Sequence, residues 1–243
     1  MRCEVVACLG GVSLKYFFVF PETAKYFAPY FIEESKGKVV ALADYDLKEW
    51  KLMGNEFSPY GEFSMLHIQT SSVLLPYGRC IFHGVAFCWH DKAWLMTAPS
   101  GVGKSTQYQN LKELYPEEIS IINGDRPVLE LKKDNTIMVH PSPWNGKENW
   151  HGAEAAPLAG VICLMQDRKN QIKRLSTEEA AKQIFMSVFQ SYESEKIIKM
   201  AGGMAAEIMK RVPVWLLTNL GDFDSSRLLY ETIKEWEEHG SDV

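Results

Sequence analysis

The sequence predicts an α/β protein built on a mixed β-sheet, and three observations indicate this. Short apolar runs of strand length alternate with longer stretches of helical periodicity along the 243 residues. Polar turns at residues 90–92 and 133–135 each separate two strand-like runs, which is the pattern of a β-hairpin. Other strand-like runs are separated by a helix, as in a crossover connection. Hairpins together with crossovers give a sheet with strands of both directions.

Residues 1–75 are expected to form an N-terminal accessory portion of small α+β type. Strands are expected at residues 5–9 and 14–20, joined by a turn at Gly10 and Gly11. The other elements expected in this portion are a short helix within residues 21–31, a strand at 39–43 and a helix at 62–75. A Pro-Tyr-Gly segment then marks the boundary to a second portion, residues 76–243.

The second portion is expected to open with a strand at residues 80–89, in which His83 shares one face with apolar residues. Further strands are expected at residues 93–97, 119–122, 128–131, 136–139, 158–165 and 214–217. Helices are expected at residues 105–114, 176–191, 195–211 and 224–238. Ser176 and Glu179 form a capping box at the start of one of them. A polar loop rich in proline and glycine is expected at residues 141–152.

Composition narrows the class of protein. The net charge of −5 argues against nonspecific binding of nucleic acid through a basic face. The five cysteines are odd in number and lack a C-x-x-C pair, which argues against a disulfide framework or a zinc site. Charged residues interrupt the apolar N-terminal stretch, so neither a signal peptide nor a membrane span fits it, and we expect a cytoplasmic protein.

Residues 98–106 read Ala-Pro-Ser-Gly-Val-Gly-Lys-Ser-Thr and match a phosphate-binding loop. The pattern G-x-x-x-x-G-K-[ST] is met except at its first glycine, which Ala98 replaces. Lys104 is expected to reach the terminal phosphates of a nucleotide, and the Ser105 hydroxyl to ligate Mg²⁺. The residues expected to bind the nucleotide are Ser100, Gly101, Val102, Gly103, Lys104, Ser105 and Thr106. The alternative, a plain Gly/Ser turn, is disfavoured because a strand-like run precedes the motif and a helical pattern follows it.

Asp125 is the best candidate for a metal contact or a general base, because it follows a short apolar strand downstream of the motif. Its alternative role is that of a turn residue. For His83 the pattern alone favours a satisfied core histidine over a catalytic one. Lys147 lies beside a tryptophan and a glycine in the polar loop, and this segment could stack on a base or clamp a phosphate. The alternative is a solvated loop with one anchoring tryptophan.

Four segments together resemble the HPr kinase/phosphorylase-like proteins, within the superfamily that includes phosphoenolpyruvate carboxykinase. These segments are residues 82–86, 98–106, 122–127 and 141–148, and the last looks like a loop of small bacterial members. The resemblance covers roughly residues 75–235. It implies the mixed-sheet core of that superfamily.

The resemblance also implies roles. Asp125 would accept the proton of a serine-like hydroxyl with Mg²⁺ nearby, and His83 would orient or polarise Asp125. Lys104 and the loop amides would hold the β- and γ-phosphates. The chain departs from the HPr kinases at Gly124, where they carry a second acidic residue, and this weakens the case for a second metal contact and for the reverse reaction. It also lacks their carboxy-terminal signature, so HPr is not the expected acceptor.

The leading hypothesis is an ATP- and Mg²⁺-dependent kinase that phosphorylates a hydroxyl of a peptide, a protein or a small molecule. ATP is not distinguished from other nucleoside triphosphates. The first alternative is a nucleotide-binding regulator without transferase activity, and the second is simple hydrolysis of the nucleotide. Neither a nucleic acid nor a membrane is an expected partner. The oligomeric state is left open, and a homo-oligomer is possible because the kinase family that the chain resembles often forms rings.

Overall fold

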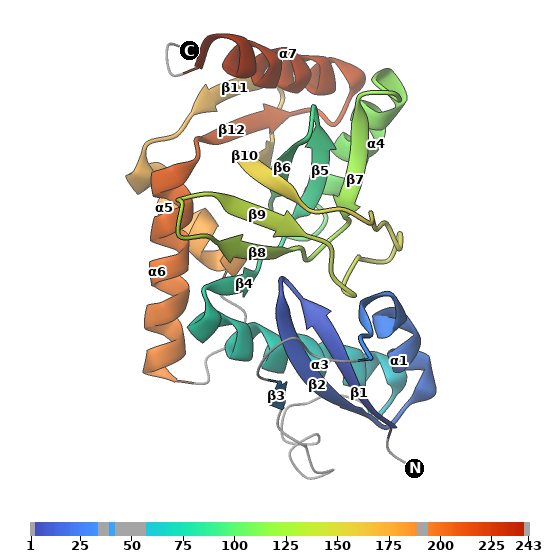
Figure 1. The fold of residues 1–243 in the computed structure, drawn as a ribbon. Helices are drawn as coiled ribbons and strands as arrows, with labels where there is room; N and C mark the ends of the chain where they lie inside the picture. The colour runs from blue at the N-terminus through green and yellow to red at the C-terminus, as the bar shows by residue number, and fades with distance from the viewer. Residues whose placement is uncertain (1–2, 34–38, 42–56, 189–193, 241–243) are drawn as a thin grey trace.

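The computed structural model describes residues 3–33, 39–41, 57–188 and 194–240 (Figure 1). Strands β1 (Cys3–Leu9) and β2 (Val12–Phe18) form an antiparallel hairpin, and β3 (Val40–Ala41) pairs parallel to β2. The turn glycines Gly10 and Gly11 have φ values of 54° and 77°, as a two-residue hairpin turn requires. The predicted hairpin is therefore confirmed, whereas the last two residues of the strand expected at 39–43 lie outside the described residues.

Helix α3 (Pro59–Leu74) is the main helix of the N-terminal portion and packs with α1 (Pro21–Phe27) against the small sheet. Ser58 caps α3 by accepting a hydrogen bond from the N–H of Gly61. The fully buried carboxylate of Glu62 accepts hydrogen bonds from the backbone N–H groups of Val19 and Phe20, at 2.6 and 3.1 Å. The first turn of α3 is thereby tied to the end of β2. Short 3₁₀ turns follow each helix, at Ala28–Tyr30 and Leu75–Tyr77.

The larger sheet has nine strands and is mixed, as the sequence predicts. Its central strand, β10 (Ala156–Gln166), runs parallel to β6 (Lys92–Thr97) and β12 (Val214–Asn219) and antiparallel to β9 (Ile137–His140). The remaining strands are β4 (Arg79–Ile81), β5 (Val85–Trp89), β7 (Ile119–Asn123), β8 (Val128–Leu131) and β11 (Gln171–Arg174). The predicted hairpins β5–β6 and β8–β9 are both present.

Helices cover both faces of this sheet (Figure 1). Helices α5 (Thr177–Val188) and α6 (Glu195–Arg211) bury one apolar cluster, and α4 (Lys104–Leu114) and α7 (Phe223–His239) bury another. Successive residues of β6 alternate between the two clusters, with Leu95 on the first side and Trp94 and Met96 on the second. Such alternation on a sheet buried on both faces produces the continuous apolar strands seen in the sequence.

The single strand expected at residues 80–89 is wrong. The chain forms β4, leaves the sheet for residues 82–84, and resumes as β5 beside different partners. A Cβ on Gly84 would lie 2.6 Å from the carbonyl oxygen of Met96, so only glycine fits this crossing point. Three successive N–H groups here donate to three separate segments: Phe82 to Pro127, His83 to Ser187 and Gly84 to Asp125. His83 thus lies between two strands rather than in the middle of one.

One strand was missed and several boundaries differ from expectation, among them those of β2 and α3, which begin two and three residues earlier than expected. Strand β11 was not predicted, because its residues are mostly exposed and polar and it lies at the edge of the sheet beside β12. The helix expected to reach residue 191 is described as α5 to Val188, and the rest of that prediction lies outside the described residues.

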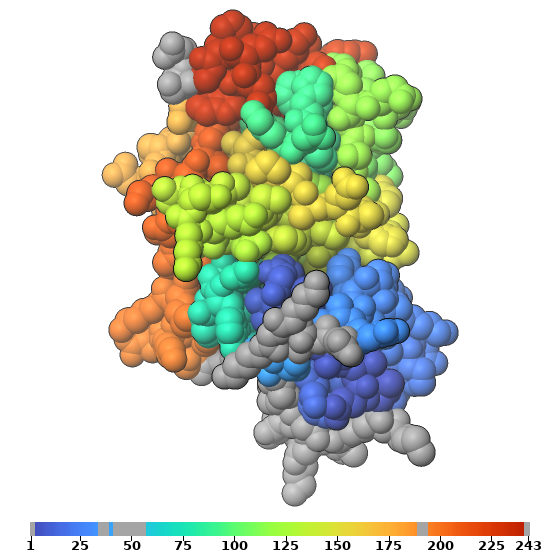
Figure 2. Space-filling view, viewed as in Figure 1, coloured from blue at the N-terminus to red at the C-terminus, as the bar shows by residue number. Residues whose placement is uncertain are grey.

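The two portions of the chain pack directly against each other (Figure 2). Ile81, Val128 and Trp144 of the second portion belong to the same apolar cluster as α3 and the small sheet. The division into residues 1–75 and 76–243 stays a prediction. Among the described residues, no helix combines the length and the apolar character needed to cross a bilayer.

Candidate active site

A glycine-rich loop, residues 98–103, joins the end of β6 to the start of α4, which is the order of elements that the motif requires. Gly101 and Gly103 have φ values of 82° and 110°, a conformation that favours glycine. A Cβ added to either would meet no atom within 4 Å. The loop therefore has open space around these two glycines. It lies at the N-terminus of α4, where the backbone N–H groups of a helix favour an anion.

Lys104 is the first residue of α4, and its Nζ donates a hydrogen bond to the carbonyl oxygen of Ala98 at 2.8 Å. Burial lowers the pKa of Lys104, the carboxylate of Asp125 opposes this shift, and the guanidinium of Arg126 adds to it. The ammonium and the carboxylate thus interact electrostatically across the loop. The methyl group of Ala98, where the motif has glycine, is buried in the apolar cluster under α4.

The other predicted phosphate-binding residues lie along the same loop and the first turn of α4. Ser100, Gly101 and Thr106 are exposed, whereas Val102, Gly103 and Ser105 are half-buried. Their contact with a phosphate stays a prediction.

Asp125 is presented by a tight turn directly after β7. The side chain of buried Asn123 accepts hydrogen bonds through Oδ1 from the N–H groups of Asp125 and Arg126, at 3.1 and 2.7 Å. Its Nδ2 donates to the carbonyl oxygen of Ser142 at 3.0 Å. This fully bonded amide fixes the turn, and with it the place of the Asp125 carboxylate.

The structure brings His83 and Asp125 together, with Nε2 of the imidazole 3.5 Å from Oδ1 of the carboxylate. Burial lowers the pKa of His83 to about 4, the positive charges of Lys104 and Arg126 also lower it, and Asp125 opposes them. The imidazole is therefore neutral at pH 7, and the contact with Asp125 is not an ion pair. At 3.5 Å it is longer than an ordinary hydrogen bond.

The backbone of His83 is fixed by the residues around it. Its N–H donates to the carbonyl oxygen of Ser187 at 2.7 Å, and its own carbonyl oxygen accepts from the Thr97 hydroxyl at 2.9 Å. The hydroxyls of Thr97 and Ser187 are 2.7 Å apart. Since Thr97 is the last residue before the glycine-rich loop, the position of His83 is coupled to the position of that loop.

Two residues that the sequence analysis did not assign to the site also contribute. Nε of Arg126 lies 3.2 Å from Oδ2 of Asp125, and Nη1 of Arg126 lies 3.1 Å from Nε2 of His67 on helix α3. Arg126 could have been suspected because it adjoins Asp125 in the chain. His67 carries no local signal, since it is a single histidine in a helix of the N-terminal portion.

In the polar loop 141–152, Trp144 takes the anchoring role that was the alternative to stacking on a base. Trp144 is buried, packs against Phe27 and Phe63 and donates from Nε1 to the carbonyl oxygen of Phe63, so it anchors the loop and is not free to stack on a base. Gly146 approaches Asp125 closely, since a Cβ added to Gly146 would lie 3.2 Å from the Cβ of Asp125. Lys147 is exposed, and its phosphate contact stays a prediction.

Within the described residues, no cluster of three or more His, Cys, Asp or Glu side chains is placed to hold a metal ion. Mg²⁺ is commonly held by one or two carboxylates together with the phosphates of a nucleotide. Asp125 and the Ser105 hydroxyl beside an open loop fit that pattern. They do not fit a site made of protein ligands alone.

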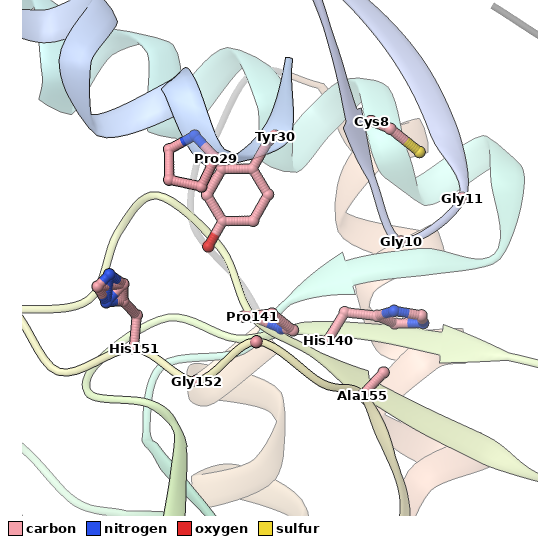
Figure 3. Close-up of a pocket in the computed structure, with 11 residues that line it drawn as sticks. Cys8, Gly10, Gly11, Pro29, Tyr30, His140, Pro141, His151, Gly152 and Ala155 are labelled. Carbon is pink, nitrogen blue, oxygen red and sulfur yellow. The ribbon is translucent and has the colours of Figure 1, made fainter. Parts of the chain in front are cut away.

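A pocket of about 500 Å³ is lined by residues from both ends of loop 141–152 and lies between the β1–β2 turn and the end of β9 (Figure 3). In Figure 3 the hydroxyl of Tyr30 points from the N-terminal portion toward the loop that carries Pro141 and Gly152. His140 and His151 line the opposite wall. Burial lowers the pKa of His140, against the opposing effect of Glu130 at 3.0 Å, so this imidazole is neutral at pH 7.

No protein-family model matches the chain, and no curated protein matches it in sequence. Among solved structures, the fold is similar to that of the HPr(Ser) kinase/phosphatase from Coxiella burnetii, with 10% sequence identity and a TM-score of 0.40. The match covers 65% of this chain and 98% of that one.

Proposed function

We propose that the chain is an ATP- and Mg²⁺-dependent kinase that transfers the γ-phosphoryl group to a hydroxyl of a peptide, a protein or a small molecule. The observation that carries the proposal is the Asp125–His83 pair, 3.5 Å apart, whose carboxylate interacts electrostatically with Lys104 at the end of an open glycine-rich loop. Phosphoryl transfer to a hydroxyl needs a phosphate-binding loop and a general base close together, and the glycine-rich loop and Asp125 are candidates for these two parts.

In this proposal the loop N–H groups and Lys104 hold the β- and γ-phosphates, and Asp125 accepts the proton of the attacking hydroxyl. The acceptor oxygen forms a bond to the γ-phosphorus, the bond from that phosphorus to the bridging oxygen breaks, and ADP leaves. Mg²⁺, held by Ser105 and Asp125 with the phosphates, would neutralise charge on the transferred group. Neutral His83 faces Oδ1 of Asp125 and limits its rotation.

Geometry also supports a second candidate, a nucleotide-binding regulator without transferase activity. Asp125 is paired with Arg126 through Oδ2 and stands without an acidic neighbour at position 124. One of its two oxygens is thus already engaged by a guanidinium. This candidate predicts nucleotide binding with no turnover.

The test has two measurements on the purified full chain. Calorimetry with Mg²⁺ and ATP measures binding, and transfer of ³²P from γ-labelled ATP to serine-containing peptides and to free serine measures catalysis. Saturable binding together with transfer to a hydroxyl supports the kinase. Binding without transfer or phosphate release supports the regulator, and phosphate release without an acceptor supports hydrolysis. No uptake of any nucleotide refutes all three.

A further inference from the structure

Arg126 joins groups from the two portions of the chain. Through Nε it contacts Oδ2 of Asp125 at 3.2 Å, and through Nη1 it contacts Nε2 of His67 at 3.1 Å. All guanidinium nitrogens are donors, and the group stays protonated in proteins. Nε2 of His67 must therefore be the acceptor, which places the imidazole proton on Nδ1.

The surroundings of His67 keep it in that form. Its side chain is buried on helix α3, and the ring of Trp144 lies edge-on to it with centroids 5.5 Å apart. Burial lowers the pKa of His67 well below its usual value, and the positive charge of Arg126 lowers it further. A neutral imidazole with an available lone pair is the partner that a guanidinium N–H needs.

We propose that His67 is a positioning residue, which holds the Arg126 guanidinium against Oδ2 of Asp125 and leaves Oδ1 to face His83 and the acceptor hydroxyl. This inference rests on the proposed function. It makes α3 of the N-terminal portion a part of the site, although no residue of α3 touches the reacting atoms in this scheme.

The physical reason lies in the freedom of the arginine. An arginine side chain carries about 2 kcal/mol of rotamer entropy, and a contact to a partly exposed carboxylate offsets little of it. A second hydrogen bond from the same planar group to a buried acceptor fixes its orientation. Once the guanidinium is fixed, rotation of the Asp125 carboxylate is restricted, and small misplacements of a catalytic group reduce rate strongly.

Two substitutions of similar size distinguish the hydrogen bond that His67 accepts from Arg126 from the space that its side chain fills. His67→Gln keeps an acceptor near the position of Nε2, and His67→Met fills the same space without one. We expect kcat to fall roughly 10–100-fold in the methionine variant and less than about 3-fold in the glutamine variant, with the KM for ATP unchanged in both. Equal losses in the two variants, or no loss in either, would overturn the proposal.

A double-mutant cycle tests the route through Arg126. If His67 acts only by holding that arginine, His67→Met should reduce kcat no further when Arg126→Met is already present. An additional loss as large as in the wild-type background would show that His67 acts in another way. Thermal unfolding of each variant checks that the comparison is made on folded protein.

A measurement without nucleotide keeps this inference separate from the proposed function. The exchange of the Arg126 Hε proton with water can be followed by ¹⁵N NMR, with the signal assigned through Arg126→Lys. We expect exchange to be at least about fivefold faster in His67→Met and close to wild type in His67→Gln, because the ion pair opens more often without its second anchor. Unchanged exchange in the methionine variant refutes the positioning role, whereas absence of phosphoryl transfer in the wild type would refute the kinase and leave this result standing.

Discussion

The backbone carbonyl oxygen of Asn145 lies 2.4 Å from the point that a Cβ on Gly124 would occupy. The side chain of Trp150 approaches the same point at 3.1 Å, and the N–H of Gly124 donates to the carbonyl oxygen of Trp150 at 2.8 Å. Loop 141–152 therefore closes directly over Gly124. No side chain fits at position 124 while the loop holds its place.

Gly124→Ala should therefore destabilise the protein by about 1–3 kcal/mol, since backbone atoms of the loop must move to admit the methyl group. The matched control is Gly203→Ala in α6, where an added Cβ meets nothing within 4 Å and replacing a helical glycine should stabilise by about 0.5–1 kcal/mol. Urea unfolding of both variants gives the two free energies. Equal stability of the two variants would contradict this account of the loop.

Asp125→Asn should lower kcat by about 10²–10⁴-fold if Asp125 is the general base, because an amide cannot accept the hydroxyl proton. ATP affinity should change much less, since the loop and Lys104 supply the main phosphate contacts in the proposal. Steady-state kinetics with labelled ATP and calorimetry measure the two effects. Asp91→Asn, in the exposed β5–β6 turn, removes the same charge away from the site and should leave kcat unchanged. Undiminished transfer by Asp125→Asn would reject the base assignment.

Lys104→Ala should weaken ATP binding roughly 10–100-fold, the worth of one or two charge-assisted hydrogen bonds to the phosphates. Removal of Lys133, which is exposed in the β8–β9 turn, controls for the loss of one positive charge. Calorimetry at a fixed salt concentration compares the two variants. An affinity reduced equally in both would mean that Lys104 acts only through net charge.

Glu62→Leu should destabilise the protein by about 1–3 kcal/mol, because the N–H groups of Val19 and Phe20 lose their acceptor in a partly buried place. Glu62→Gln keeps one side-chain oxygen and should cost less. Chemical unfolding monitored by tryptophan fluorescence reports the difference. If the leucine variant proves as stable as the glutamine variant, these two hydrogen bonds do not hold α3 to the end of β2.

Stability should fall as the pH drops from 7.5 to 5.0. His67, His83 and His140 have lowered pKa values in the folded protein, that of His83 to about 4. Below the usual value of about 6.5 the unfolded chain binds protons that the folded chain does not, so the free energy of unfolding decreases. Urea unfolding at the two pH values should show a smaller decrease for His67→Gln than for wild type, because the carboxylates contribute equally to both. Identical decreases would mean that His67 is protonated in the folded state.

Local patterns were sufficient for most of the fold. The hairpin turns at Gly10–Gly11 and at His90–Asp91 were correctly placed, because left-handed backbone favours these residue types. Helices α4, α6 and α7 were located to within a residue or two of each end, because apolar periodicity and capping are local properties. The mixed sheet followed from hairpins and crossovers in one chain.

Long-range contacts account for what the sequence did not reveal. The break at residues 82–84 depends on carbonyl groups of Pro127, Ser187 and Asp125, none of which is near in sequence. For the site, the motif and the strand end pointed to Lys104 and Asp125 separately, and their electrostatic interaction appeared only in the folded chain. His67 could not be assigned, because nothing in helix α3 indicates that it faces Arg126.

The hydroxyl contact between Thr97 and Ser187 joins positions 90 residues apart in the chain. At the usual pace of translation, roughly 5–20 residues per second, the glycine-rich segment leaves the ribosome about 5–18 s before its partner on α5. A nascent chain of intermediate length would carry the complete motif while the hydrogen bond that steadies β6 beside it was still missing. A nucleotide of the proposed kind, if present during synthesis, would thus reach its full affinity for the loop only after α5 had emerged.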